Sequence, residues 1–280
     1  MPEGDTVWRT ARRLDQALSG ARLTRADLRV PAFATARLTG REVLETVPRG
    51  KHLLTRLGGG LTLHSHLRMD GSWRTFADGE RWSGGPGHEI RAVLGTAERT
   101  AVGYRLPVLE LLPTAREEEV VGHLGPDLLG ADWDAGEALR RLRADPGRAI
   151  GEALLDQRNL AGLGNVYRSE LCFLVRIPPW TPVGLVPAPE RLLALAHRLL
   201  DVNKARAERC TTGDRRRGRM LWVYGRGNRP CLRCGTPVRS ADAGPASRAP
   251  RPVYWCPACQ PEPSGTARPG PPRWAGPAGR

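Results

Sequence analysis

The stretch CLRCGTPVRSADAGPASRAPRPVYWCPAC (residues 231–259) carries two Cys-x-x-Cys pairs and constrains the fold more than any other segment of the chain. Four thiolates can close a tetrahedral zinc site, which leaves no open position for a substrate. The pattern therefore predicts one structural zinc ion, bound in a β-hairpin finger by Cys231, Cys234, Cys256 and Cys259. Two separate structural or redox cysteine pairs are the alternative.

Positive charge is concentrated in the C-terminal part of the chain. The formal net charge of the 280 residues is +14, and residues 203–280 hold 16 Lys and Arg against 4 Asp and Glu, a net of +12 (16 − 4). A protein this basic attracts polyanions, and nucleic acid is the commonest such partner. Arg251 lies in the expected hairpin and suits phosphate contact, because its guanidinium donates in a planar fork. A merely soluble basic protein with solvated arginines is the alternative.

The sequence contains no recognisable secretory signal and no apolar run of about 18 residues, so we expect no membrane span. The predicted location is therefore the cytoplasm, where disulfides are rare. This setting favours a metal site over disulfides for the paired cysteines.

The first part of the chain alternates short apolar runs with turn signals. Residues 5–18 have helical spacing of apolar residues, with Asp5 or Thr6 as the expected cap. Residues 51–67 form an expected hairpin, because a triple glycine separates two strand-like runs. Further strands are expected at 89–94 and 100–112. Strands at this spacing predict a β-sandwich or barrel.

After about residue 114 the sequence pattern becomes typical of helices. Helices are expected over residues 134–144, 149–157, 163–174 and 189–210. The expected fold is α+β and multidomain: a β-sandwich with an N-terminal helix (1–113), a helical domain (114–225), the zinc finger (226–260) and a disordered Pro- and Gly-rich tail (261–280).

The segment LAGLGNVY (160–167) lies between two expected helices. Gly162 and Gly164 permit a tight turn and a close approach of the backbone to a ligand. A helix N-terminus there, with the Asn165 amide, could hold a phosphate group. A plain turn between helices is the alternative.

The segment HSHLRMDG (64–71) ends a strand and enters a turn. His64 and His66 share one face of that strand, as a metal pair would. No third ligand is evident, so buried or hydrogen-bonded histidines are the favoured interpretation. Met69 is expected at the tip of the turn, either as a core residue or as a wedge that enters a base stack.

The N-terminus reads Met-Pro-Glu-Gly, and the small second residue makes Met1 a substrate for removal. Removal would leave the secondary amine of Pro2 beside the carboxylate of Glu3. An α-amino group has a pKa of about 7.7–8.0, well below the value of about 10.4 for lysine, so it is a better nucleophile near neutral pH. An ordinary start followed by proline is the alternative for this dipeptide alone.

Taken together and in chain order, these features resemble the formamidopyrimidine-DNA glycosylase/endonuclease VIII family. They are Pro2-Glu3-Gly4, Arg49-Gly50-Lys51, HSHLRMDG, LAGLGNVY and the four cysteines. The resemblance runs from residue 2 to about 260, and the sequences PEGDT and RPVYWCPACQ are closer to the endonuclease VIII branch. It implies that the helical domain is a helix–two-turns–helix DNA-binding domain.

The resemblance also implies catalytic roles. Pro2 resembles the nucleophile that attacks C1′ and forms a Schiff base, and Glu3 resembles the acid that assists opening of the sugar ring. Lys51, expected on the first strand of the hairpin, resembles the lysine that contacts phosphate and assists elimination. Arg251 resembles the finger arginine that grips phosphate and assists the last elimination.

Three further residues are expected to contact DNA on the same grounds. Asn165 resembles the phosphate contact beside the lesion. Arg68 and Met69 occupy the positions from which family members fill the gap left by a flipped base. The chain departs from the family pattern at Thr6, where many members have a second glutamate, and at Arg105-Leu-Pro-Val, where one branch has Arg-Arg-Phe-Gly.

The resemblance thus implies a bifunctional DNA glycosylase and abasic-site lyase of base excision repair, which removes oxidised bases, pyrimidines in particular. Zinc is the one expected cofactor. The expected partner is damaged double-stranded DNA, with single-stranded DNA left open, and the expected protein is a monomer at the nucleoid. Two alternatives remain: a non-catalytic DNA-binding protein, and an RNA-binding zinc-ribbon protein.

Overall fold

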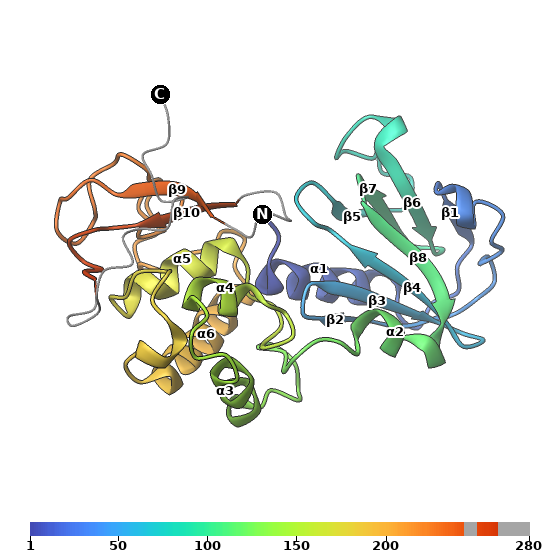
Figure 1. Cartoon of the computed structure of the whole chain (residues 1–280). Coiled ribbons are helices and arrows are strands. Elements are labelled where there is room, and N and C mark those ends of the chain that lie inside the picture. The colour runs from blue at the N-terminus through green and yellow to red at the C-terminus, as the bar shows by residue number, and fades with distance from the viewer. Residues whose placement is uncertain (244–250, 263–280) are drawn as a thin grey trace. The chain divides into compact units, whose positions relative to one another are not determined.

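The computed structural model describes residues 1–243 and 251–262. The chain divides into two compact units, Met1–Leu124 and Gly125–Arg280 (Figure 1). Most of the expected tail, residues 263–280, lies outside the described residues. Among the described helices, none is both long and apolar enough to cross a membrane.

The first unit is a β-sandwich, as the strand spacing predicts. One antiparallel four-stranded sheet has the order β1-β6-β7-β5 and the other β2-β3-β4-β8. The strands are β1 (Arg25–Leu28), β2 (Val43–Arg49), β3 (His52–Leu57), β4 (Leu61–His66), β5 (Ser72–Ala77), β6 (Ile90–Gly95), β7 (Arg99–Tyr104) and β8 (Val108–Pro113). Their inner faces form one core, to which the sheets contribute Leu28, Leu94, Leu53 and Leu63.

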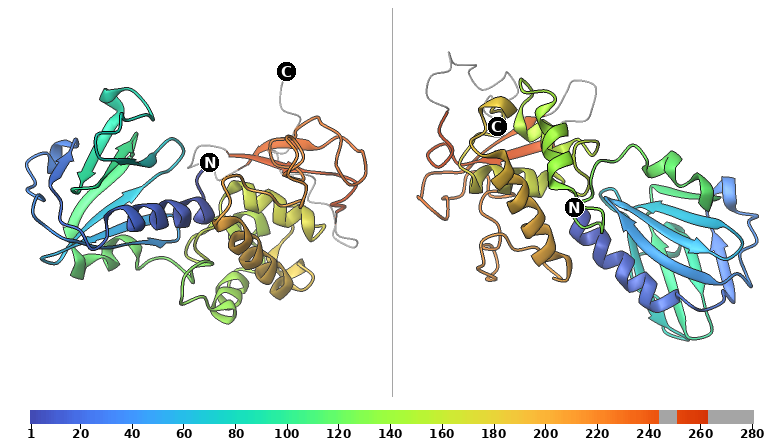
Figure 2. Two further views of the ribbon diagram at one scale, coloured as in Figure 1. Left: turned by 180° about the vertical axis from the view of Figure 1, so that it is seen from behind. Right: turned by 90° about the horizontal axis from the view of Figure 1, so that it is seen from below.

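The helix α1 (Gly4–Leu18) completes this core and lies alongside the strands (Figure 2). Its buried residues Val7, Ala11, Leu14 and Leu18 follow the expected helical spacing. The expected cap was wrong: the N-cap is Glu3, two or three residues earlier, and the Val7 N–H donates to the Glu3 carbonyl at 3.0 Å. Asp5 lies inside the first turn instead.

Two turns differ from the expectation in instructive ways. Lys51 does not lie on a strand but in the two-residue turn Gly50-Lys51, because Arg49 of β2 is already paired with His52 of β3. Gly50 has φ +58°, the positive value that the first position of a tight hairpin turn requires.

The single strand expected over 100–112 is two strands, β7 and β8, because Arg105 has φ +48° and breaks the extended chain. The glycine turn between β3 and β4 is confirmed.

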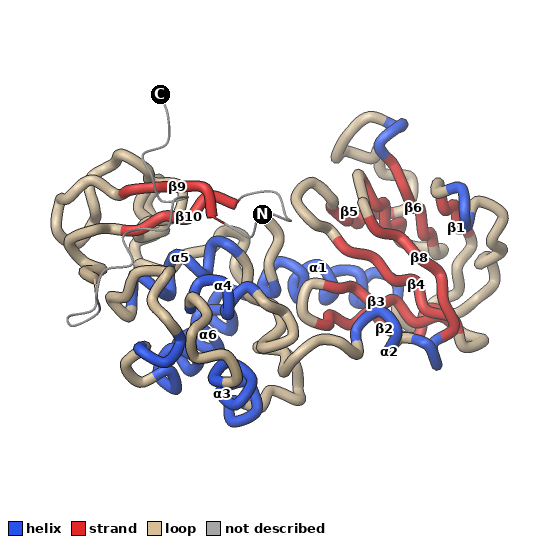
Figure 3. Tube along the Cα trace, in the orientation of Figure 1, coloured by secondary structure: helices blue, strands red, loops and turns tan. Residues whose placement is uncertain are grey.

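The second unit contains the expected helices and ends in the cysteine-rich hairpin, as Figure 3 shows. The helices are α3 (Ala135–Arg143), α4 (Ile150–Leu155), α5 (Asn165–Leu174) and α6 (Pro189–Lys204), and the hairpin strands are β9 (Arg239–Ala243) and β10 (Arg251–Trp255). The short helix α2 (Glu118–Val121) belongs to the first unit. The last helix stops before residue 210 because the Asn203 side chain bonds the Cys210 N–H and carbonyl, at 2.8 and 3.1 Å, and folds the chain back.

A buried carboxylate fastens the segment before the finger to the helices. Glu170 of α5 has no exposed surface and accepts three backbone N–H groups, from Trp222 at 2.8 Å, Val223 at 2.9 Å and Tyr224 at 2.9 Å. The Thr211 hydroxyl also donates to it. Nearby, the Arg233 guanidinium of the first cysteine pair lies 4.3 Å from the Phe173 ring centroid.

We predict that Glu170→Ala lowers the free energy of unfolding by about 3 kcal/mol or more, because four donors lose their acceptor, and two of these bonds, from Thr211 and Val223, are buried. Glu190→Gln is the matched control: Glu190 meets Arg143 with both side chains 53% exposed, so its loss should cost less than about 1 kcal/mol. Urea unfolding followed by circular dichroism measures both. Equal costs would contradict an anchoring role for Glu170.

Candidate functional site

The N-terminus of α1 lies at the same end of the sandwich as the Lys51 turn. The helix runs antiparallel to β2: the Gly20 N–H donates to the Val43 carbonyl at 2.8 Å, and the Thr46 N–H donates to the Asp15 carboxylate at 2.9 Å. From Asp15 back to Gly4 the helix rises about 16 Å. From Thr46 forward to Lys51 the strand advances about the same distance.

Pro2 and Glu3 lie together at this helix start. Glu3 is fully buried and does not use its side chain to cap α1. Pro2 precedes it and is partly buried, whereas Met1 is 40% exposed. With Met1 attached, the Pro2 nitrogen is an amide; once Met1 is removed, it is a secondary amine next to a carboxyl group.

The turn that follows β4 emerges at this end as well, because His66, the last residue of β4, pairs with His52, the first residue of β3. Arg68 has φ +44°, and its N–H donates to the His66 Nδ1 at 2.9 Å. Met69 is 58% exposed. The expectation that Met69 lies at a turn tip is thus correct, and the core alternative for this side chain is wrong.

A histidine cluster lies at the strand ends that border the Lys51 turn. His64 is buried, and its Nδ1 lies 2.9 Å from the Glu110 carboxylate of β8. Its other nitrogen, Nε2, lies 2.8 Å from Nδ1 of His52. The hydrogen-bonded interpretation of the HSH sequence therefore holds for His64.

Two rings of the cluster, His52 and His66, are held in their neutral form. Burial, followed by the charges of His66, His64, His123 and Lys51, lowers the pKa of His52 to about 3. Burial, followed by the charges of Lys51, Arg68 and His64, lowers the pKa of His66 to about 4. Neutral rings add no positive charge beside Lys51 at physiological pH.

In the second unit, two candidate DNA contacts are brought together across the chain. Asn165 is the first residue of α5, and its side-chain amide donates to the Pro252 carbonyl of β10 at 2.7 Å. Arg168, one turn later, donates to the same carbonyl at 3.3 Å. Arg251, the exposed neighbour of Pro252, is therefore held beside the N-terminus of α5. Gly162 has φ +105°, which explains the glycine in the preceding turn.

The four cysteines converge as their spacing predicts. Their sulfur atoms all lie within 4.8 Å of one another, with Cys231 and Cys259 at 4.0 Å and Cys234 and Cys256 at 3.5 Å. A tetrahedral zinc ion with bonds of 2.3 Å needs sulfur atoms about 3.8 Å apart. The donor set and its geometry thus fit one zinc ion.

Sequence reasoning missed three residues at these sites. His52 and Glu110 join the histidine cluster from β3 and β8, and only the strand register reveals it. Arg168 follows Asn165 by three residues, so it shares a face of α5 with it, and this spacing is a signal that the sequence does contain.

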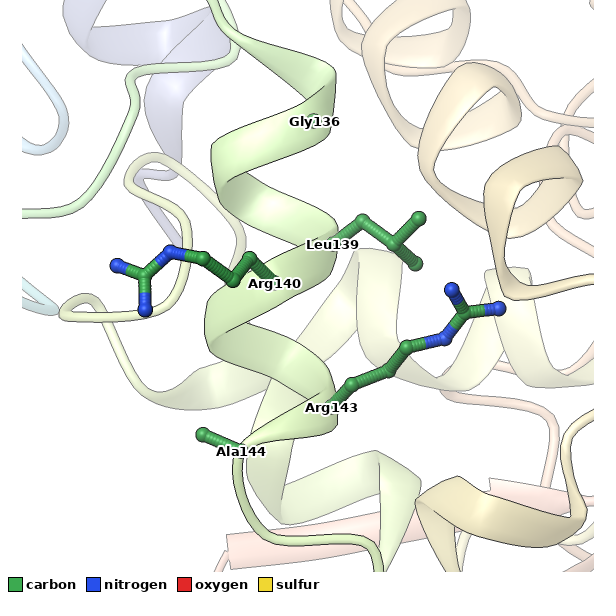
Figure 4. A pocket seen from close by; sticks show the side chains of 5 residues that line it. All are labelled: Gly136, Leu139, Arg140, Arg143 and Ala144. Carbon is green, nitrogen blue, oxygen red and sulfur yellow. The ribbon is translucent and has the colours of Figure 1, made fainter.

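An open depression beside α3 does not add a further site. It is lined by Gly136, Leu139, Arg140, Arg143 and Ala144, and Figure 4 shows its two arginines pointing to opposite sides of the helix. Each arginine is already paired, Arg140 with Glu137 and Arg143 with Glu190. They do not converge on one anion.

Comparison with known proteins points to one family for both units. Residues 1–105 match the formamidopyrimidine-DNA glycosylase N-terminal domain, and residues 124–205 match the formamidopyrimidine-DNA glycosylase H2TH domain. The chain is 66% identical over 272 residues to a probable endonuclease 8 2 of Streptomyces coelicolor, covering 96% of this chain and 97% of that one.

Two more comparisons extend this similarity. The chain is 48% identical over 260 residues to the DNA-(apurinic or apyrimidinic site) lyase Nei2 of Mycolicibacterium smegmatis, covering 93% and 99% of the two chains. Its fold resembles that of Lactococcus lactis Fpg in complex with DNA that contains an abasic site, with a TM-score of 0.76, 23% identity and coverage of 93% and 100%.

The neutral histidines predict a loss of stability in acid. Their pKa values are lowered on folding, so between about pH 6.5 and about pH 4 the unfolded chain binds more protons than the folded chain. Stability contributed by the cluster is therefore complete above about pH 6.5 and is lost as the pH falls toward 4. We expect the melting temperature to fall less between pH 7 and pH 4.5 in His52→Gln than in the wild type.

His88→Gln is the control for this prediction, because His88 lies on the short η2 helix (Gly87–Glu89), away from the cluster. Its melting temperature should follow the wild-type curve. Parallel curves for all three proteins would mean that the cluster does not titrate on unfolding.

Proposed function

Because this chain belongs to the formamidopyrimidine-DNA glycosylase family, we propose that it is a bifunctional DNA glycosylase and abasic-site lyase of base excision repair. Its substrates are oxidised bases, pyrimidines in particular, in damaged double-stranded DNA. The observation that carries the proposal is the placement of the start of α1 and the Lys51 turn at one end of the sandwich. The names of the Streptomyces and Mycolicibacterium relatives support it.

The chemistry starts at the amine of Pro2 after removal of Met1. The Pro2 nitrogen attacks C1′ of the damaged nucleotide, and the base departs. Glu3 gives a proton to the sugar ring oxygen, the ring opens, and the nitrogen and C1′ form an iminium ion, the Schiff base. This ion acidifies the C2′ proton, so β-elimination breaks the bond to the 3′ phosphate and δ-elimination breaks the bond to the 5′ phosphate.

Other residues bind and orient the substrate. Lys51 contacts the phosphate next to the reacting sugar and assists elimination. Arg68 and Met69 fill the space that the flipped nucleotide leaves, a role that suits an exposed apolar side chain at a turn tip. In the second unit, Arg251 contacts a phosphate group and also assists the last elimination. Asn165 has no exposed surface, so the phosphate contact expected of it is replaced here by a supporting role: its side-chain amide donates to the Pro252 carbonyl, next to Arg251.

The metal in this proposal is structural. Cys231, Cys234, Cys256 and Cys259 would hold one zinc ion, which would stabilise the finger hairpin that carries Arg251. Four protein ligands leave no open position on such an ion, so every reaction step belongs to the Pro2 amine and the side chains of the protein.

Borohydride trapping on DNA with an abasic site tests the nucleophile. We expect the Met1-processed protein, verified by mass spectrometry, to form a covalent adduct. Pro2→Gly should give at least about tenfold less adduct, because a primary amine at a flexible residue replaces the fixed secondary amine. Lys204→Ala, which removes the only other lysine besides Lys51, should trap as the wild type does.

The absence of an adduct with the processed wild type would favour a non-catalytic DNA-binding protein. A fully active Pro2→Gly variant would remove Pro2 from the mechanism.

The salt dependence of DNA binding tests Arg251. We predict that Arg251→Ala weakens binding to all sequences and lowers the slope of log K against log salt by about one unit, because one phosphate contact is lost. Arg239→Ala is the matched control: this exposed arginine lies at the opposite end of the same hairpin, where it pairs with Trp255. An unchanged slope for Arg251→Ala, or equal changes in both variants, would show that Arg251 does not bind phosphate.

A further inference from the structure

We propose that Glu110, His64 and His52 form a hydrogen-bonded relay that positions the ammonium group of Lys51. The relay fixes His52 as the tautomer whose Nε2 accepts a hydrogen bond. The proposal rests on the role given above to Lys51 and deepens it by assigning three positioning residues to that role.

Which nitrogen carries the proton in each bond of the relay follows from Glu110, the residue at its exposed end. The ionised Glu110 carboxylate can only accept, so the His64 Nδ1, at 2.9 Å, carries a proton and donates it. In a neutral His64 ring, Nε2 then has a lone pair and accepts. The proton in the 2.8 Å bond between the two rings therefore belongs to His52 Nδ1. His52 is left with an unprotonated Nε2.

Burial makes this assignment stable. The His64 side chain is only 4% exposed, so water cannot readily replace either of its two partners. The Glu110 side chain is 49% exposed, so its carboxylate stays in contact with solvent. One end of the relay thus lies in solvent and the other end beside the Lys51 turn.

A hydrogen-bond acceptor next to the Lys51 turn can bind the lysine ammonium group, which only donates. His52 directly follows Lys51 in the chain and is the first residue of β3. His66, the last residue of β4, pairs with His52, so both rings lie at the end of the sheet where the Lys51 turn is. An imidazole with a free Nε2 attracts and orients an ammonium group, whereas the other tautomer would direct an N–H at it.

The other rings next to His52 are consistent with this tautomer. The His66 Nδ1 accepts the Arg68 N–H at 2.9 Å, which fixes its proton on Nε2 when the ring is neutral. His66 and His123 meet His52 edge-on, with ring centroids 4.9 and 6.3 Å away. The lowered pKa values of His52 and His66 keep these rings uncharged above about pH 5. Within the described residues, only the four cysteines qualify as a metal-binding group, so we interpret the histidines as a hydrogen-bond chain.

Two replacements of His64 separate the relay from simple packing. Glutamine can accept from the His52 Nδ1–H and donate to Glu110, so His64→Gln keeps both hydrogen bonds of the relay in the same direction. Phenylalanine fills similar volume but makes neither bond. We expect His64→Phe to slow strand cleavage at an abasic site about tenfold and His64→Gln to slow it less than about threefold. The Kd for DNA with a tetrahydrofuran abasic analogue should stay within about twofold in both.

The His52 tautomer is read directly by two-bond ¹⁵N–¹H correlation NMR on the free protein. The wild type and His64→Gln should show a proton on Nδ1, and His64→Phe a mixture of tautomers. Glu110→Leu changes an exposed residue and breaks the same relay, so it replaces His64→Phe if that variant does not fold. His88→Gln is the control and should match the wild type in all measurements.

The outcomes separate the two proposals. If the wild type forms the borohydride adduct but His64→Phe cleaves as fast as the wild type, the relay is wrong and the proposed function stands. Equal slowing in His64→Gln and His64→Phe, or a proton on Nε2 of His52 in the wild type, would also overturn the relay. If the wild type forms no adduct, the proposed function fails, and the role of the relay in positioning Lys51 fails with it.

Discussion

The antiparallel pairing of α1 with β2 is the constraint on which the first unit depends. Two backbone bonds near Val43 and the Asp15–Thr46 bond fix where the helix begins relative to the strand. The equal lengths of the two elements then bring Pro2 and Glu3 to the Lys51 turn. A slip of one helical turn would move the N-terminus about 5 Å, farther than a reacting atom can be misplaced.

Burial of polar groups without loss of their partners is the common device of both units. Glu170 in the second unit and His64 in the first are both nearly inaccessible to solvent. Such groups are costly unless they are hydrogen-bonded, and in return a satisfied one has a single orientation. Glu170 uses this to hold a backbone segment, and His64 to join two strands.

Much of this architecture could be predicted from sequence because its signals are local. Apolar spacing gave α1, the triple glycine gave the β3–β4 turn, and the cysteine spacing gave the sulfur cluster. The errors lie where tertiary contacts override local preference. Asn203 reaches Cys210 and ends α6 early, and the pairing of Arg49 with His52 leaves Lys51 in a turn. The partnership of His64 with Glu110, 46 residues apart, depends on strand register and has no local signal.

The contact between α5 and the finger has a consequence for solubility. A two-stranded sheet has two edges, and an open edge is a template for pairing with a strand of another molecule. On β10, Pro252 has no N–H to offer, and its carbonyl is already occupied by Asn165 and Arg168. An incoming strand would find neither donor nor acceptor at this position. The contact that holds Arg251 in place thus also protects the finger from edge-to-edge aggregation.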